Sequence, residues 1–191
     1  MHLTVTSVDY RPRGIAAVTV TPDPSEEAAG GDSVPAPSDA EEAAAPALIL
    51  ADTALLHRLA PGRSLTPAEW LAIREEGRHG LAVRHSMDLV AHKPRSEAEV
   101  RRALAAHAAA FDVSEVDAAM ARLRDLGAVD DGRWAAGYVA QPRANGRGAR
   151  LLRRELSQRG VQAADVASAL DGRDEGPAAL AAALKRARAL R

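Results

Sequence analysis

The feature of the sequence that most constrains the fold is an internal repeat of about 50 residues in the second half of the chain. Residues 101–120, RRALAAHAAAFDVSEVDAAM, align with residues 153–170, RRELSQRGVQAADVASAL, at an offset of 52 positions that becomes 50 after a two-residue length difference. A repeat of this length is typical of stacked helical modules, because each unit buries its apolar face only against a neighbour. The sequence therefore predicts a mainly α fold built from tandem units.

Apolar spacing and cap residues divide this region into two three-helix units, which lie at 78–129 and 130–172. In the first unit, Val83, Met87 and Val90 recur at helical spacing, and Pro94 is placed to end that helix. The remaining segment, residues 175–191, is long enough for one helix, and we interpret it as the remnant of a third repeat.

Cap signals mark the boundaries of the other helices. Ser96 and Glu99 have the spacing of a capping box, and Ser114 and Asp117 repeat that spacing before the next helix. Asp130 or Asp131 is placed to cap a further helix, which Pro142 closes. Glycines at positions 127 and 160 are placed to end two others.

Two helices show clear apolar stripes. Val116, Met120 and Leu123 share one face of the third helix of the first unit. Trp134 and Tyr138 stand at i and i+4, which indicates a core stripe more simply than a surface for stacking on nucleobases.

Residues 1–77 differ in character from the repeats and predict a small α/β region. LTVTSVDY and GIAAVTV flank the turn formers of RPRG, which favours a β-hairpin, and ALIL at 47–50 resembles a short strand. Thr66 and Pro67 begin a helix that Gly77 is placed to end. Residues 22–46 are rich in Pro, Gly, Ser, Ala and acids, so we expect a disordered acidic loop there.

Composition excludes several classes of protein. The chain has 191 residues, no cysteine and only 3% aromatic residues, so disulfides and thiolate sites are excluded and the core must be aliphatic. No long apolar run or basic leader is present, which predicts a cytoplasmic protein with no membrane segment.

The charge is distributed unevenly. Residues 1–77 contain 5 basic and 12 acidic residues, whereas residues 78–191 contain 20 basic and 14 acidic residues. The two parts therefore carry −7 and +6, which indicates that the second part meets an acidic partner.

The basic residues concentrate in ANGRGARLLRREL, residues 144–156, which holds Arg147, Arg150, Arg153 and Arg154 with a single acid. On a helix of about 100° per residue, Arg150 and Arg154 fall within about 60° of Arg147, while Leu152 and Leu156 fall about 140–180° away. A charged face is commonly only solvated. Arginine instead of lysine, however, favours bidentate contacts to carboxylate or phosphate.

Three segments carry a resemblance to a known family. RSEAEVRRAL, LGAVDDGRWAAGYV and GRGARLLRRELSQRGV resemble, in order and spacing, the RecX family of cytoplasmic bacterial regulators of the RecA recombinase. The resemblance covers about residues 78–171.

The resemblance implies an elongated, curved array of three-helix repeats that lies along the groove of the RecA filament on DNA. Such a protein hinders ATP turnover and strand exchange and modulates recombination and the SOS response to DNA damage. It is not an enzyme. Capping of filament ends and coating of the groove are both compatible with the sequence.

The chain departs from the family pattern in three places. Pro142 stands directly before Arg143, so we expect a bend before the arginine segment. The third repeat is short, and the acidic loop at 22–46 looks like an insertion.

Residues that suggest other chemistry form no complete site. His85 and His92 would lie about 10 Å apart on one helix, too far to share a metal ion. Asp130 and Asp131 lack a neighbouring His, Ser or Lys, so we expect no catalytic residues, no cofactor and no metal.

Two function classes follow for what we expect to be a monomer. The first is a regulator that binds the RecA filament. The second is a helical module that binds single- or double-stranded DNA through phosphates. The expected partner-binding residues are Arg147, Arg150, Arg153, Arg154, Arg143, Arg95 and Arg102.

Overall fold

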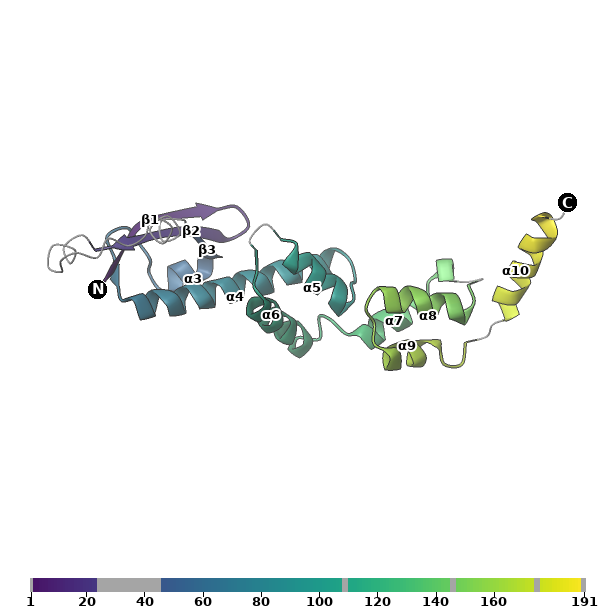
Figure 1. The fold of residues 1–191 in the computed structure, drawn as a ribbon. Coiled ribbons are helices and arrows are strands. Elements are labelled where there is room, and N and C mark those ends of the chain that lie inside the picture. The colour runs from purple at the N-terminus through teal and green to yellow at the C-terminus, as the bar shows by residue number, and fades with distance from the viewer. Residues whose placement is uncertain (1, 24–45, 108–109, 145–146, 174–175, 190–191) are drawn as a thin grey trace, which may run out of the picture. The chain divides into compact units, whose positions relative to one another are not determined.

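The computed structural model of the chain describes residues 2–23, 46–107, 110–144, 147–173 and 176–189. The expected acidic loop lies outside the described residues from position 24 to position 45. The chain is mainly helical with a small N-terminal sheet (Figure 1). It forms two compact units, Met1–His85 with Ala108–Ala119, and Ser86–His107 with Met120–Arg191.

The sheet belongs to the first unit. Strands β1 (Leu3–Arg11) and β2 (Ile15–Pro22) form the expected antiparallel hairpin, with β3 (Ala47–Leu50) beside β2 and β4 (Ser64–Leu65) beside β1. Arg13 and Gly14 both have positive φ, 65° and 66°, as a tight hairpin turn requires. Val5, Val18 and Ile49 are at most 1% exposed and form the centre of its core.

Helix α3 (Ala51–Leu56) and the part of α4 (Pro67–His92) up to His85 also belong to this unit. Neither α3 nor β4 was expected, because each is too short to show a period in the sequence. Thr66 and Glu69 form a capping box at the start of α4, in which the Thr66 amide donates to Glu69 Oε2 at 2.8 Å and the Glu69 amide donates to Thr66 Oγ1 at 3.2 Å.

The expected end of α4 at Gly77 is wrong, because the helix continues to His92. Gly77 is buried, and a Cβ placed on it would lie 2.5 Å from Ile49 Cβ. The glycine therefore lets β3 pass close to the helix and does not end it. The expected boundary between residues 77 and 78 falls inside this helix.

An ion pair holds the first turn of α6 (Val113–Asp125) against α4. Arg78 Nη2 donates to Glu115 Oε2 at 2.7 Å, Arg78 Nε also donates to Glu115, and the guanidinium lies 5.5 Å from the Phe111 ring centroid. The Asp112 amide also donates to Glu115 Oε2, and the Glu115 amide donates to Asp112 Oδ1, each at 2.9 Å. The cap of α6 is thus Asp112 with Glu115, and the expected cap at Ser114 and Asp117 is wrong because α6 begins one residue before Ser114.

The second unit contains the rest of the helices. Their bounds are α5 Glu97–Ala105, α7 Asp131–Val139, the 3-10 helix η1 Pro142–Ala144, α8 Ala149–Gln158, α9 Ala163–Leu170 and α10 Gly176–Ala189. The chain leaves α7 before Pro142 and passes through one 3-10 turn, so the expected bend before the arginine segment is present.

Most of the expected caps are confirmed. Ser96 and Glu99 form a capping box on α5, and Asp130 caps α7 by accepting a hydrogen bond from the Arg133 amide. Gly127 and Gly160 have φ of 62° and 88° after α6 and α8.

The apolar spacings expected on α6 and on α4 have different outcomes. Met120 and Leu123 on α6 are fully buried, as expected. Met87 on α4 is 38% exposed, whereas Ala82 and Ser86 are fully buried, so the buried stripe of α4 lies one residue earlier than expected. The side chains that face the core here, Ala82 and Ser86, are small. The sequence pattern instead favours Val83 and Met87, one position later, because their side chains are larger and apolar.

We expect Gly77→Ala to lower the free energy of unfolding by about 1–3 kcal/mol, because its Cβ would overlap the branched carbon of Ile49. Gly80→Ala is the matched control on the same helix, since its nearest neighbour is the mobile Leu50 Cδ2 at 3.0 Å. Urea unfolding followed by circular dichroism measures both. Equal stability of the two variants would contradict the close approach of β3.

Candidate partner-binding surface

Helix α8 has one buried face and one charged face. Leu152 and Leu156 are fully buried and pack in a cluster with Val161 after the helix and Val166 on α9. Since Leu152 and Leu156 are four residues apart, they fix which side of α8 faces the core. The opposite side of the helix is directed to solvent.

Arg150, Arg153 and Arg154 lie on this solvent-facing side and are all exposed. In the part of the chain that the structure describes, none of the three has a hydrogen bond or an ion pair through its side chain. Leu151 follows Arg150 in the chain and is 47% exposed. We call these four residues the α8 surface.

Arg147 differs from the other three arginines. Helix α8 begins at Ala149 with Gly148 as its N-cap, so the helical-wheel position expected for Arg147 is wrong. Its Nη1 donates to both carboxylate oxygens of Glu155, each at 2.8 Å, and the Tyr138 hydroxyl donates to Glu155 Oε2 at 3.0 Å. Arg147 is therefore held by the one acid of the segment.

Among the described residues, no hydrogen bond or ion pair joins Arg95 or Arg102 to the α8 surface. Arg95 is half-buried, and its Nε donates to the Leu89 carbonyl at 3.3 Å. Arg102 is exposed, and its Nε donates to the Ala98 carbonyl at 3.1 Å. The side chain of Arg143 lies outside the described residues.

Arg159, which follows α8, was missed by sequence reasoning. Its Nη1 donates to Glu99 Oε1 at 2.5 Å, and its guanidinium lies 5.7 Å and 5.3 Å from the ring centroids of Trp134 and Tyr138. The two rings are themselves stacked, with centroids 5.4 Å apart. No local spacing links Glu99 with a residue 60 positions later, although an aromatic pair at i and i+4 is a site where a cation can stack.

A polar junction joins α5 to the second half of this unit. The Ser96 hydroxyl donates to the Arg159 carbonyl at 2.8 Å, and the Glu97 amide donates to Asp131 Oδ1 at 2.8 Å. A Cβ on Gly160 would lie 2.3 Å from Ala98 Cβ, so the backbone approaches α5 closely at this point. These contacts fix the end of α8 and thereby the direction of its arginines.

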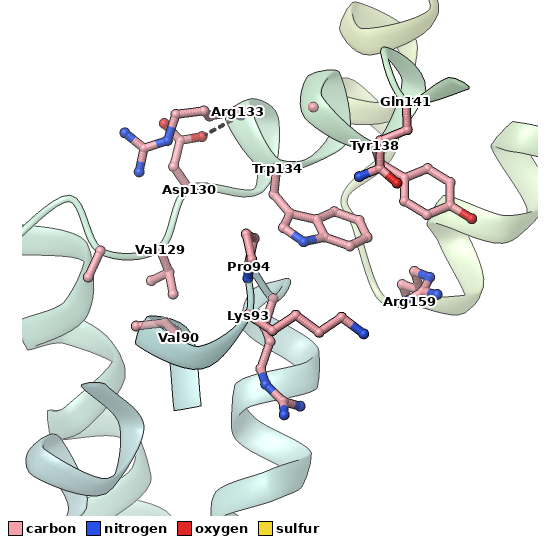
Figure 2. A pocket seen from close by; sticks show the side chains of 13 residues that line it. Val90, Lys93, Pro94, Val129, Asp130, Arg133, Trp134, Tyr138, Gln141 and Arg159 are labelled. Carbon is pink, nitrogen blue, oxygen red and sulfur yellow. Dashed lines mark hydrogen bonds between the residues drawn. The ribbon is translucent and has the colours of Figure 1, made fainter. Parts of the chain in front are cut away.

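A pocket of about 500 Å³ opens beside this junction (Figure 2). Val90 and Val129 line one part of it, and Trp134 and Tyr138 line another. Tyr138 is only 7% exposed, as expected for a core residue, whereas Trp134 is half-buried and presents part of its indole to the pocket.

Comparison with known proteins identifies the region that contains α7, α8 and α9. The family model described as RecX, second three-helix domain, matches residues 130–170. Residues 130–170 are thus similar to the second three-helix domain of RecX. They coincide with the repeat that contains the α8 surface.

Relatives agree on the same family. The regulatory protein RecX of Pectobacterium atrosepticum is 29% identical over 106 residues, which are 48% of this chain and 65% of that protein. The regulatory protein RecX of Ectopseudomonas mendocina is 35% identical over 97 residues, which are 50% of this chain and 62% of that protein. The chain thus spans less than two thirds of the length of these relatives.

The fold agrees as well. A crystal structure of regulatory protein RecX matches 99% of this chain and 85% of its own chain, with a TM-score of 0.63 and 18% sequence identity. At this identity the match shows a shared fold, which includes the helical second half and the small N-terminal sheet. Over the described residues, no helix is both long enough and apolar enough to span a membrane.

We expect Asp131→Asn to stabilise the protein at pH 7. Burial raises the pKa of Asp131, and the nearby Glu97 and Asp165 carboxylates raise it further, while the hydrogen bond from the Glu97 amide opposes them. The folded state therefore disfavours the ionised carboxyl, and stability is lost as pH rises through this raised pKa. Asparagine keeps an oxygen acceptor for the Glu97 amide and has no charge.

The gain should shrink as pH falls through the raised pKa of Asp131, because the wild-type carboxyl then becomes neutral too. Thermal unfolding at pH 7 and pH 4 measures the difference. Asp88→Asn, at an exposed position on α4, controls for the change in net charge. A lower melting temperature for Asp131→Asn at pH 7 would contradict this account of the junction.

Proposed function

We propose that this protein is a non-enzymatic, cytoplasmic regulator that binds the RecA recombinase filament and inhibits its ATPase and strand-exchange activities. It thereby modulates homologous recombination and the DNA-damage response. The names of its relatives, regulatory protein RecX, support a regulatory role. The observation that carries the proposal is the set of three exposed guanidinium groups, without internal partners in the described chain, on one side of α8.

The geometry of α8 suits binding to a fixed acidic surface. The fully buried Leu152 and Leu156 hold the helix, so the arginines are presented on a rigid element. Each guanidinium offers a planar set of donors that matches a carboxylate in a bidentate contact. A preorganised set of three cations loses less freedom on binding than a flexible tail would.

Leu151 favours a protein partner over a bare phosphate backbone. Its side chain is 47% exposed on the same helix as Arg150 and Arg154. Burial of this side chain against an apolar recess would contribute about 1 kcal/mol or more, at about 25 cal/mol per Å² of apolar surface. A line of phosphates offers no comparable apolar surface.

The second candidate function is direct binding of DNA through phosphates, since the same three guanidinium groups match phosphate as well as carboxylate. The two functions differ in their salt dependence and in their partner. Phosphate binding weakens by close to one log unit per log unit of salt for each contact and needs no recombinase. Filament binding requires both the recombinase and its nucleotide.

We expect charge reversal of the three α8 arginines, Arg150→Glu, Arg153→Glu and Arg154→Glu, to raise the concentration for half-inhibition of the filament ATPase by about tenfold or more. Helicity and melting temperature should stay close to those of the wild type, because the three side chains form no hydrogen bond or ion pair with the residues that the structure describes. Single-stranded DNA filaments are titrated with protein while ATP hydrolysis and filament length are followed together.

The matched control reverses three exposed arginines elsewhere, Arg58, Arg74 and Arg122, and changes the net charge by the same amount. This control should inhibit almost like the wild type. Full inhibition by a folded α8 variant would count against the proposed surface. Equal loss in both variants would mean that net charge, and not the α8 surface, governs binding.

A further inference from the structure

The pocket beside the α5 junction has apolar walls and a cationic rim. Val90, Val129 and Trp134 supply apolar surface, and Lys93 and Arg133 add positive charge (Figure 2). Arg95 also lines the pocket and is cationic. Asp130 is the one acid among the lining residues that the structure describes, and its carboxylate already accepts the Arg133 amide as the cap of α7. A volume of about 500 Å³ lies in the range of pockets that enclose a ligand.

The polar groups available to a ligand here are mainly donors. Among described residues, the Lys93 ammonium and the Trp134 indole N–H have no hydrogen-bond partner. Arg95 uses Nε toward the Leu89 carbonyl, which leaves its two terminal nitrogens available. A ligand that satisfies these donors must bring acceptors, and negatively charged acceptors bind cationic donors most strongly.

The aromatic surface is already partly covered by a cation. The Arg159 guanidinium lies over both Trp134 and Tyr138 and is tied to Glu99 at 2.5 Å. A nucleobase that stacked on this side of the rings would have to displace a cation that has a carboxylate partner. The exposed part of the Trp134 indole suits an aliphatic side chain better. Such a side chain can pack against this part of the ring without using the face that Arg159 covers.

We propose that this pocket binds an acidic peptide segment of the partner protein. An apolar side chain of the segment enters between Val90, Val129 and Trp134, and flanking carboxylates pair with Lys93 and Arg95. The inference rests on the proposed function, in which the partner is a protein filament. The pocket would be a second site of contact with the partner, in addition to the α8 surface, and it would recognise an acidic segment with an apolar side chain.

The two tryptophans of the chain make the pocket directly observable. Trp70 is 8% exposed in the core of the first unit, so Trp70→Phe leaves Trp134 as the single fluorescent reporter. The probe is a blocked peptide in which one leucine is flanked by two aspartates on each side. We expect saturable quenching or a shift of the Trp134 emission with this peptide, and none with the same peptide carrying lysines.

The pocket variant, Lys93→Glu with Arg95→Glu in the same reporter background, should weaken binding of the acidic peptide at least about tenfold. Lys93 is exposed, and circular dichroism checks that the variant is folded. A second reporter variant, Lys93→Glu alone, should weaken binding by an intermediate factor. Unchanged affinity in a folded pocket variant would overturn the proposal.

Oligothymidylate of the same net charge serves as the competing ligand. A response to it with none to the acidic peptide would overturn the proposal in favour of a nucleic-acid site. A response to neither ligand would overturn it as well.

A filament assay separates this inference from the proposed function. If the wild type fails to bind recombinase filaments, the proposed function is wrong whatever the peptide does. If the wild type inhibits and the pocket variant inhibits equally well, only the pocket inference is wrong. Weaker filament inhibition by the pocket variant, together with weaker peptide binding, is the expected result.

Discussion

The arrangement of the second unit depends on the contacts of Arg159. Its guanidinium pairs with Glu99 and lies over two aromatic rings, and its carbonyl accepts the Ser96 hydroxyl. Ser96 and Glu99 are also the capping box of α5. One residue thus connects the start of α5, the stacked rings of α7 and the end of α8. Because the Arg159 guanidinium is paired in this way, removal of one partner, such as Glu99, would strongly destabilise the second unit.

Local signals in the sequence were sufficient to locate most helices. Ser96, Asp130 and Gly160 mark helix ends that the structure confirms. These signals work because caps and positive-φ glycines act through neighbours within about four residues.

The errors arise where a distant residue changes the meaning of a local signal. A glycine after a run of helical residues indicates a helix end. Gly77 instead lies in the middle of α4, because Ile49 of β3 occupies the space that a side chain at position 77 would fill. Asp112 displaced the expected cap at Ser114 because its partner Glu115 is fixed by Arg78 from another helix. The sequence pattern predicts that Arg147 lies on the helix, because no neighbouring residue was interpreted as a signal that α8 begins two positions later, at Ala149. The pairing of Arg159 with Glu99, and the pocket beside it, could not be predicted for the same reason.

Glu155 determines how much positive charge the segment around α8 presents. It neutralises Arg147 and accepts the Tyr138 hydroxyl, so within the described residues the segment presents three unpaired cations where composition suggests four. Loss of this one carboxylate would release Arg147 and raise the local charge without any change to an arginine. Since such charges act over roughly 8 Å at physiological salt, a single acidic position can tune the long-range attraction of the whole face.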